Sequence, residues 1–341
     1  MNENDLVSII VIVSDEGTID KCLESIFKQT YKNYEVIIGD NGKQNDKIFD
    51  FADRITYLKV DHCNNSMLKN KAINLAKGKY LCFVTGNDVL KPDYLKQLVA
   101  HINDHDLAIG NYTAISSFKS NNKEIVYFKE DINKQYFELL KIDRLYNLNS
   151  KLYKREYIKK YNLFFNENNK SQNDLLFNIS YLIYCNSINV FEQKICLVNH
   201  RQLKDYQTDL FETEKDSLLV LKRKANENSY SLNLINYLYI RLGFEELIQD
   251  IAFNQEFPVV LNDKVYYIIN KKEVLEALDN YIISCFKANV YMLVIKARNV
   301  YLVKGFAYCL YLIKYRKLNE LIGNLKERAF ALKKLVVKDN T

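Results

Sequence analysis

The sequence contains no apolar run long enough to cross a membrane. A membrane-spanning helix needs about 18 or more consecutive apolar residues, and charged or amide side chains interrupt every apolar stretch of this 341-residue chain well before that length. The opening segment carries Glu3 and Asp5 and then becomes strand-like, which is not the pattern of a secretory signal peptide. We therefore expect neither a membrane-spanning protein nor a secreted one.

The chain also has no Cys-x-x-Cys pair among its seven cysteines. An odd number of unpaired, scattered cysteines argues against a zinc site and against a disulfide framework. Four of them, Cys22, Cys82, Cys185 and Cys309, lie inside apolar runs, where a cysteine packs as a small apolar residue. The pattern predicts reduced thiols in a cytoplasmic protein.

Apolar and charged residues are present in the proportions of a folded domain. Hydrophobic residues make up 48% of the chain and charged residues 26%, and the net charge is +6. A chain of this length can bury one large domain and a smaller one. We place the boundary after residue 204, which gives domains 1–204 and 205–341.

The first part of the chain has the pattern of a β-α-β unit. Residues 6–13 form a continuous β-branched run, which is typical of a strand buried on both faces of a parallel sheet. From Thr18 the apolar residues Ile19, Leu23 and Ile26 follow helical spacing, and residues 34–38 form a second strand-like run. The sequence therefore predicts a doubly wound α/β sheet in which the loops after the strands meet at one crevice.

Further elements continue this alternation of strands and helices. The predicted strands are 55–60, 80–84 and 107–111, and the predicted helices are 67–76 and one that starts at Pro92. We interpret residues 116–135 as a surface loop with a hairpin, outside the sheet, because they are polar and irregular.

A polar turn follows the apolar strand 80–84. Thr85, Gly86, Asn87 and Asp88 come directly after this strand, and open α/β sheets bind ligands at the carboxyl ends of their strands. A cluster of carboxylates at such a point can hold a hard cation and a diphosphate. Here only Asp88 carries a charge, because Thr85 and Asn87 stand where two carboxylates would make a stronger site.

Four segments in order resemble the inverting family 2 nucleotide-sugar glycosyltransferases of GT-A fold. The segments are VSIIVIVSDEGTIDKCLESIFKQTYKNYEVIIGDNG, SMLKNKAINLAKGKYLCFVTGNDVLKPDYL, SKLYKREYI and SQNDLLFN. The resemblance covers residues 6 to about 201. Because four motifs occur in the right order over this length, the assignment of the fold is specific, although no single motif would make it so. It implies a GT-A-type mixed sheet that is Rossmann-like, and transfer of a sugar from a nucleotide diphosphate, usually UDP, to an acceptor hydroxyl with inversion.

The resemblance assigns donor-binding roles to five residues. Ser14, Asp15 and Glu16 match the segment that lines the base and ribose of the nucleotide, and Asp40 matches the carboxylate that accepts a hydrogen bond from the uracil imide. Lys69 stands where the family commonly has an arginine facing the phosphates. The alternatives are an Asx turn or a helix cap at Asp40 and an exposed helix lysine at Lys69.

The resemblance also implies a catalytic base and a second cationic site. Asp174 matches the last carboxylate of the family's acidic pair, which deprotonates the acceptor, while Asn173 replaces its partner. The alternative is that Asp174 only caps the helix that starts there. His200 and Arg201 lie where relatives carry a cation over the active site that stabilises the departing diphosphate, or else they form a solvated strand end.

The turn after strand 80–84 determines the expectation for a metal. Relatives commonly hold Mg²⁺ or Mn²⁺ through a carboxylate at the position of Asn87, with Thr85 and Gly86 beside the donor. Asn87 offers a neutral carbonyl oxygen, and Asp88 supplies the remaining charge. We therefore expect a Mg²⁺ or Mn²⁺ ion that is weakly bound, or dispensable.

Residues beyond 204 resemble no family segment. We expect an α-rich region with helices at 212–223, 232–241 and 272–286 and a strand-like segment at 264–269. Residues 288–338 contain eleven Lys and Arg against two Glu, which favours contact with an anionic membrane surface, an acceptor or another protomer. No recognised nucleic-acid module accompanies this charge, so we expect no nucleic acid as a partner.

The sequence favours two hypotheses for the function. The first is an active glycosyltransferase that uses a UDP-sugar and a glycan, wall-polymer or lipid-linked acceptor, in the cytoplasm and at the inner face of the membrane. The alternative is a catalytically weakened homologue that binds a nucleotide sugar or a partner glycosyltransferase as a subunit of a homo- or hetero-oligomer. Binding of nucleic acid or another polyanion is the third and weakest hypothesis.

Overall fold

The computed structural model divides the chain into two compact units, which we describe one at a time. Unit 1 contains residues 1–203 and 217–231, and unit 2 contains residues 204–216 and 232–341. The described residues are 5–13, 19–41, 46–60, 63–113, 124–132, 144–168, 173–197, 210–228, 232–254, 261–279, 294, 302–303 and 305–307.

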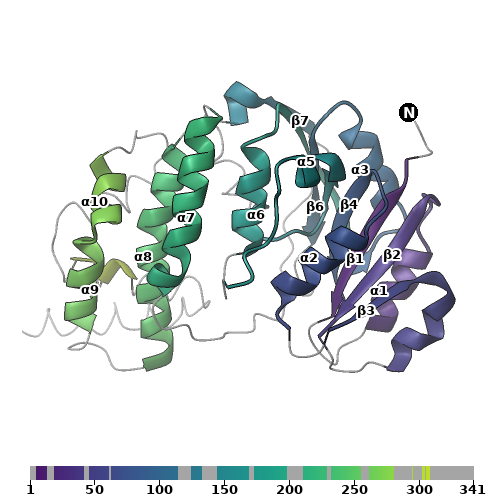
Figure 1. Ribbon diagram of the computed structural model, residues 1–341, viewed down its shortest axis with the longest axis horizontal. Coiled ribbons are helices and arrows are strands. Elements are labelled where there is room, and N and C mark those ends of the chain that lie inside the picture. Colours follow the sequence, from purple (N-terminus) through teal and green to yellow (C-terminus); the bar gives the residue numbers. More distant parts are fainter. Residues whose placement is uncertain are drawn as a thin grey trace, which may run out of the picture. The chain divides into compact units, whose positions relative to one another are not determined.

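One mixed sheet of nine strands forms the centre of unit 1 among the described residues (Figure 1). The strand order is β3-β2-β1-β4-β8-β6-β9-β5, and β7 pairs with β9 beside this path. The strands are β1 (Val7–Val13), β2 (Tyr34–Asp40), β3 (Thr56–Lys59), β4 (Tyr80–Thr85), β5 (Val89–Leu90), β6 (Leu107–Thr113), β7 (Glu124–Phe128), β8 (Lys151–Lys154) and β9 (Ser187–Leu197). Strands β1, β2, β3 and β4 are parallel, while β8 runs antiparallel to both β4 and β6.

Helices cover both faces of this sheet (Figure 1). The helical elements of this part are α1 (Ile19–Phe27), η1 (Asp46–Arg54), α2 (Asn65–Leu75), α3 (Tyr94–Ile102), α5 (Arg155–Lys160) and α6 (Asn173–Leu182). Residues from α1 and α3 join Val11 in one buried cluster. On the opposite face, Gly39 approaches Leu68 of α2, and Phe83 packs edge-on against Phe177 of α6. Because successive residues of a strand point to opposite faces, an unbroken apolar run such as β1 serves both layers.

The doubly wound mixed sheet predicted from the sequence is confirmed, including the strands near 6–13, 34–38, 55–60, 80–84 and 107–111. Helix α3 starts at Tyr94, two residues after the predicted start at Pro92. One prediction for this unit is wrong: residues 124–128 do not lie outside the sheet. They form β7, which pairs antiparallel with β9 from Glu124↔Phe191 to Phe128↔Ser187. The two segments of this pairing are about 60 residues apart in the sequence. The irregular pattern of residues 116–135 therefore gives no sign of the strand.

Unit 2 is helical in its described part. It contains α8 (Asn233–Asn254), α9 (Leu261–Ile269) and α10 (Lys272–Asp279), and α7 (Leu210–Glu227) contributes residues to both units. The strand predicted at 264–269 is wrong, because these residues belong to α9. Val265, Ile268 and Ile269 are buried, at the i, i+3 and i+4 positions of one helix face.

Within the described residues, no helix combines the length and the apolar character that a membrane crossing requires. Cys22, Cys82 and Cys185 are buried, as predicted, and so is Cys196, while Cys309 lies outside the described residues. Burial raises the pKa of the Cys185 thiol well above its ordinary range. Most of the basic stretch 288–338 lies outside the described residues.

Candidate functional site

The carboxyl ends of β1, β2 and β4 lie side by side. Val13 is the register partner of Asp40 in β2, and Ile12 is the partner of Thr85 in β4. Adjacent strands are about 4.8 Å apart, so the residues that follow these strands meet at one edge of the sheet. This edge is the crevice in which open α/β sheets bind ligands.

Asp40 is the last residue of β2 and is fully buried. Its Oδ2 atom accepts a hydrogen bond of 2.7 Å from the hydroxyl of Tyr57, and its backbone carbonyl accepts one of 2.9 Å from the N–H of Val60. Both contacts come from β3 and the residue after it. These two hydrogen bonds hold the buried side chain and the backbone of Asp40 in one orientation.

Residues 85–88, which we call the donor turn, are fixed by bonds within the fold. The N–H of Gly86 donates to the carbonyl of Ile12 over 3.1 Å, and the N–H of Asp88 donates to the carbonyl of Thr85 over 2.9 Å. The carboxylate of Asp88 is 1% exposed, and its Oδ2 accepts hydrogen bonds from the Thr85 N–H at 2.9 Å and the Asn149 amide at 2.7 Å. Asp88 therefore braces the donor turn from inside, and Asn87 is its more accessible neighbour.

The donor turn is a poor fit for a resident divalent cation. A hard cation prefers several oxygen ligands with net negative charge. In the described part of the chain, no three His, Cys, Asp or Glu side chains come together as a metal site. Asp88 already accepts two hydrogen bonds through Oδ2, and Asn87 supplies only a neutral carbonyl. The chemistry of this donor set supports weak binding of a divalent cation at most.

The structure brings together two residues that the sequence assigned to separate roles. Lys69 Nζ of α2 lies 2.5 Å from Asp174 Oδ1 in the first turn of α6, and the two side chains are 14% and 31% exposed. The ammonium group also lies 4.8 Å from the ring centre of Phe165. The pair places a carboxylate and a cation in one half-buried position, where each offsets the charge of the other.

Hydrogen bonds fasten α2 to the segment that leads into α6. The amide of Asn173 donates to the Ser66 hydroxyl over 2.9 Å. Asn70 donates to the carbonyl of Phe165 and accepts from its N–H, both over 2.9 Å. Asn173, which replaces a carboxylate in the family pattern, thus acts here as a hydrogen-bond donor between two helices. These hydrogen bonds fix α2 and the start of α6 relative to each other, and so fix the positions of Lys69 and Asp174.

Sequence reasoning missed two buried polar residues beside the donor turn. Asn149 donates to Asp88, as described above, and Lys151 is the first residue of β8 and has no exposed surface. Burial lowers the pKa of Lys151 to about 7, with a smaller opposing effect of Asp174 and a further lowering by Arg144. No local signal separates Lys151 from a surface lysine, because Lys-Leu-Tyr-Lys is also the pattern of an exposed strand.

The remaining candidate residues lie outside the described part of the chain. In the sequence, Ser14, Asp15 and Glu16 follow Val13, the last residue of β1. His200 and Arg201 come three and four residues after the last residue of β9, Leu197. The roles of these five residues stay predictions.

Comparison with known proteins identifies the family pattern in the same region. The model of the family described as Glycosyl transferase family 2 matches residues 8–169. Glycosyltransferase GlyA of Streptococcus pneumoniae is 31% identical over 144 residues, which is 40% of this chain and 20% of GlyA. The Escherichia coli UDP-Glc:alpha-D-GlcNAc-diphosphoundecaprenol beta-1,3-glucosyltransferase WfgD is 30% identical over 129 residues, which is 36% of this chain and 49% of WfgD. The matched region thus spans half or less of each of these relatives.

A solved structure extends the likeness of fold beyond this region. The crystal structure of S. aureus TarS 1-349 in complex with UDP-GlcNAc has a TM-score of 0.62 and covers 91% of this chain and 91% of that chain, at 14% sequence identity. At this identity the likeness concerns the fold alone. It confirms the predicted GT-A-type sheet followed by a helical C-terminal region.

Proposed function

Because residues 8–169 belong to glycosyl transferase family 2, we propose that the protein transfers a sugar from a UDP-sugar to an acceptor hydroxyl with inversion at the anomeric carbon. The observation that carries this proposal is the shared edge at which β1, β2 and β4 end, with buried Asp40 as the last residue of β2. A nucleotide needs such an edge, since its base and diphosphate contact loops after different strands.

Asp40 is the residue that selects uracil. Its carboxylate is buried and oriented by the Tyr57 hydroxyl at 2.7 Å, so it presents a charged acceptor to the imide N–H of the base. A charge-assisted hydrogen bond is about twice as strong as a neutral one, and cytosine offers no N–H at the equivalent ring position. The UDP and UDP-GlcNAc complexes of TarS and the UDP-Glc in the name of WfgD support this choice of donor.

Asp174 is the proposed base for the acceptor. As the acceptor oxygen attacks the anomeric carbon, its proton passes to the carboxylate of Asp174, and the bond from that carbon to the diphosphate oxygen breaks. UDP leaves with the bonding electrons, and attack from the opposite face inverts the configuration. Lys69 contacts Oδ1 of Asp174 at 2.5 Å, so the proton passes to Oδ2. Transfer of the Lys69 contact to a donor phosphate makes the carboxylate a stronger base.

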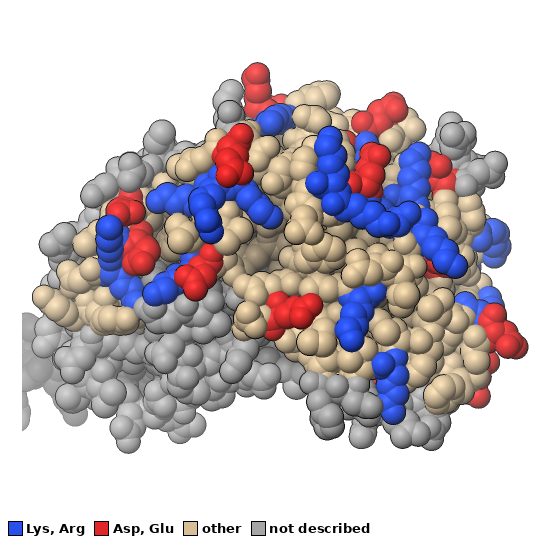
Figure 2. All heavy atoms as spheres, in the orientation of Figure 1, with Lys and Arg blue, Asp and Glu red and all other residues tan. Residues whose placement is uncertain are grey.

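The acceptor belongs to surface polysaccharide, wall-polymer or glycoconjugate synthesis in this proposal. The diphosphoundecaprenol-linked GlcNAc in the name of WfgD supports a lipid-linked acceptor. On the face shown in Figure 2, Lys and Arg of the described residues are interspersed with Asp and Glu, and no purely basic patch stands out. The proposed attachment to an anionic membrane surface therefore depends on the basic residues of the stretch 288–338 in the sequence.

A second function is favoured by one specific observation. Asp88, the charged residue of the donor turn, is buried and occupied by internal hydrogen bonds. A protein with this turn can bind a nucleotide sugar and serve as a subunit of another glycosyltransferase without transferring the sugar itself. Turnover separates this candidate from the enzyme, since both bind the nucleotide.

The deciding experiment measures hydrolysis and transfer from a panel of UDP-sugars with Mn²⁺, Mg²⁺ or EDTA, next to calorimetric titration with UDP, CDP and GDP. The enzyme proposal expects a preference for UDP and turnover of at least one donor. Loss of turnover in EDTA would indicate a weakly bound metal that arrives with the donor, and turnover that persists in EDTA would indicate metal-independent transfer. UDP binding without any turnover would favour the subunit function. Absence of any nucleotide preference would contradict the pocket itself.

A further inference from the structure

A buried segment rich in polar residues, 145–150, contacts both the donor turn and helix α6, which carries Asp174. We call it the polar turn. It precedes Lys151, and Lys151 Nζ reaches back to donate hydrogen bonds to the carbonyls of Asn147 at 2.7 Å and Asn149 at 3.3 Å. The lysine side chain is completely buried. It thus closes the polar turn on itself and gives it one fixed shape.

On one side, the polar turn holds the donor turn. The amide of Asn149 donates to Asp88 Oδ2 over 2.7 Å, and the same oxygen accepts from the backbone N–H of Thr85 over 2.9 Å. A shift of Asn149 would therefore displace Asp88 and with it residues 85–88. The contact is 6% exposed at Asn149 and 1% exposed at Asp88, so water does not compete for it.

On the other side, the polar turn holds the helix of the candidate base. Asn178 of α6 is fully buried, and its amide donates to the carbonyls of Leu145 at 2.8 Å and Asn147 at 2.9 Å. Its Oδ1 accepts from the Tyr153 hydroxyl of β8 over 2.6 Å. Asn178 follows Asp174 by four residues, so the two lie on the same face of α6. The polar turn therefore sets the position of the helix that carries Asp174.

The conformation of this segment lowers the stability of the fold. Ser150 has a φ of 57°, which is unfavourable for a residue other than glycine. Among the described residues, Asn147 Oδ1 and Ser150 Oγ are buried without a hydrogen-bond partner, and Lys151 buries an amine. Strain and unsatisfied polar groups that persist next to a candidate site are typical of function rather than of packing.

We infer that Lys151 and Asn149 are positioning residues for sugar transfer, which hold the donor turn and the base helix α6 in one frame. The inference rests on the proposed function, because it assigns the polar turn to the geometry of that reaction. Neither residue touches the reacting atoms. Lys151 fixes the shape of the polar turn, and Asn149 transmits that shape to Asp88.

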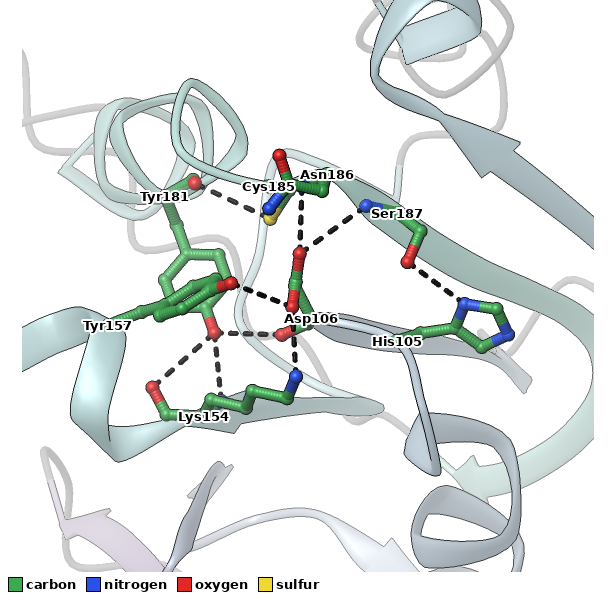
Figure 3. A network of polar contacts seen from close by, with 8 residues as sticks. All are labelled: His105, Asp106, Lys154, Tyr157, Tyr181, Cys185, Asn186 and Ser187. Carbon is green, nitrogen blue, oxygen red and sulfur yellow. Dashed lines mark hydrogen bonds and ion pairs between the residues drawn. The ribbon is translucent and has the colours of Figure 1, made fainter.

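A second lysine of the same strand, Lys154, provides a control, with a side chain that is 18% exposed. Because β8 is antiparallel to β4, Lys151 lies toward the carboxyl end of β4 and Lys154 pairs with Tyr80 at its amino end. There Lys154 Nζ donates to Asp106 over 2.9 Å, in a network that also includes the Tyr157 hydroxyl and the N–H of Asn186 (Figure 3). This network lies at the sheet edge opposite the candidate site.

The test compares Lys151→Met, Asn149→Ala and Lys154→Met in the full chain. Methionine has a similar length and no charge, so Lys151→Met removes the two hydrogen bonds without leaving a buried ion unpaired. We expect both variants of the polar turn to lower kcat by about 10- to 100-fold, with UDP affinity changed by less than about three-fold, since misplacement of reacting groups by about 1 Å costs rate rather than binding. Lys154→Met should lower the melting temperature and keep kcat within about two-fold, because it alters only the opposite edge.

The outcomes separate this inference from the proposed function. If wild type turns over and both polar-turn variants keep its kcat, the inference is overturned while the proposed function stands. If Lys151→Met and Asn149→Ala lower the melting temperature as much as Lys154→Met does and leave kcat unchanged, Lys151 and Asn149 have a structural role only. That result would also overturn the inference. A wild type that neither binds UDP nor transfers sugar would overturn the proposed function, and the inference with it.

Discussion

Lys151 gives the fold a pH dependence whose sign follows from its burial. Burial lowers the pKa of Lys151 from 10.5 to about 7 in the folded chain. Between these two values the unfolded chain binds a proton that the folded chain does not, so the free energy of unfolding rises with pH. The stabilisation is complete above the unfolded value and is lost as the pH falls toward 7.

The size of the effect follows from one proton. The slope reaches about 1.4 kcal/mol per pH unit where the folded amine is neutral and the unfolded amine is charged. Across the single unit from about pH 7.5 to about pH 8.5 the expected gain is therefore roughly 1 kcal/mol, and the whole window corresponds to about 5 kcal/mol.

The assay compares wild type with Lys151→Met in urea at several pH values from about 6.5 to about 8.5. Every other titrating group is common to both proteins, so the difference between their unfolding free energies isolates Lys151. Wild type should gain stability relative to the variant as the pH rises. If the difference in unfolding free energy between wild type and Lys151→Met stays constant with pH, solvent reaches the amine of Lys151. That result would contradict the complete burial of this side chain in the polar turn.

Three further predictions concern the nucleotide, the metal and the basic stretch. Asp40→Ala should weaken UDP binding by about 1.5–3 kcal/mol, the value of a hydrogen bond to a charged group, and should remove the preference over CDP in calorimetry; unchanged affinity would take Asp40 out of the pocket. Asn87→Asp should tighten Mn²⁺ binding measured in the presence of UDP, because it adds a charged ligand beside the diphosphate, whereas strong Mn²⁺ binding by wild type without UDP would contradict our description of the donor turn. The full chain should bind anionic vesicles through residues 288–338 and lose them as salt rises above about 0.15 M, and indifference to such vesicles at low salt in a monomeric protein would count against this attachment.

The sheet could be predicted because its signals are local. Strands β1 and β4 are almost entirely apolar runs, and the helix that follows β1, α1, has one apolar face. The two errors have physical causes. The stretch that forms β7 pairs with β9, far along the chain. The stretch in α9 is rich in Tyr, Val and Ile, and the preference of these residues for strands conceals their helical spacing.

The candidate site could be predicted only one residue at a time. The sequence predicts Asp40 in the turn after strand 34–38 and Asp174 at the start of a helix. In the structure β2 extends two residues further, so that Asp40 is its last residue, and Asp174 lies in the first turn of α6, as predicted. That Lys69 contacts Asp174, 105 residues away, is a property of the packed fold. The same holds for the bond from Asn149 to Asp88, because nothing in either local sequence identifies the other.

The central claim is that Asp174 accepts a proton from the acceptor and is not needed to hold the donor. The most direct measurement is the transfer rate and the UDP affinity of Asp174→Asn, with Asn173→Asp as a neighbouring control on the same helix turn. We predict a loss in kcat of about 100- to 10,000-fold, the usual contribution of a general base, with UDP affinity equal to or tighter than that of wild type because Lys69 is released. An Asp174→Asn variant that transfers sugar at the wild-type rate would contradict the account and leave Asp174 as a helix cap paired with Lys69.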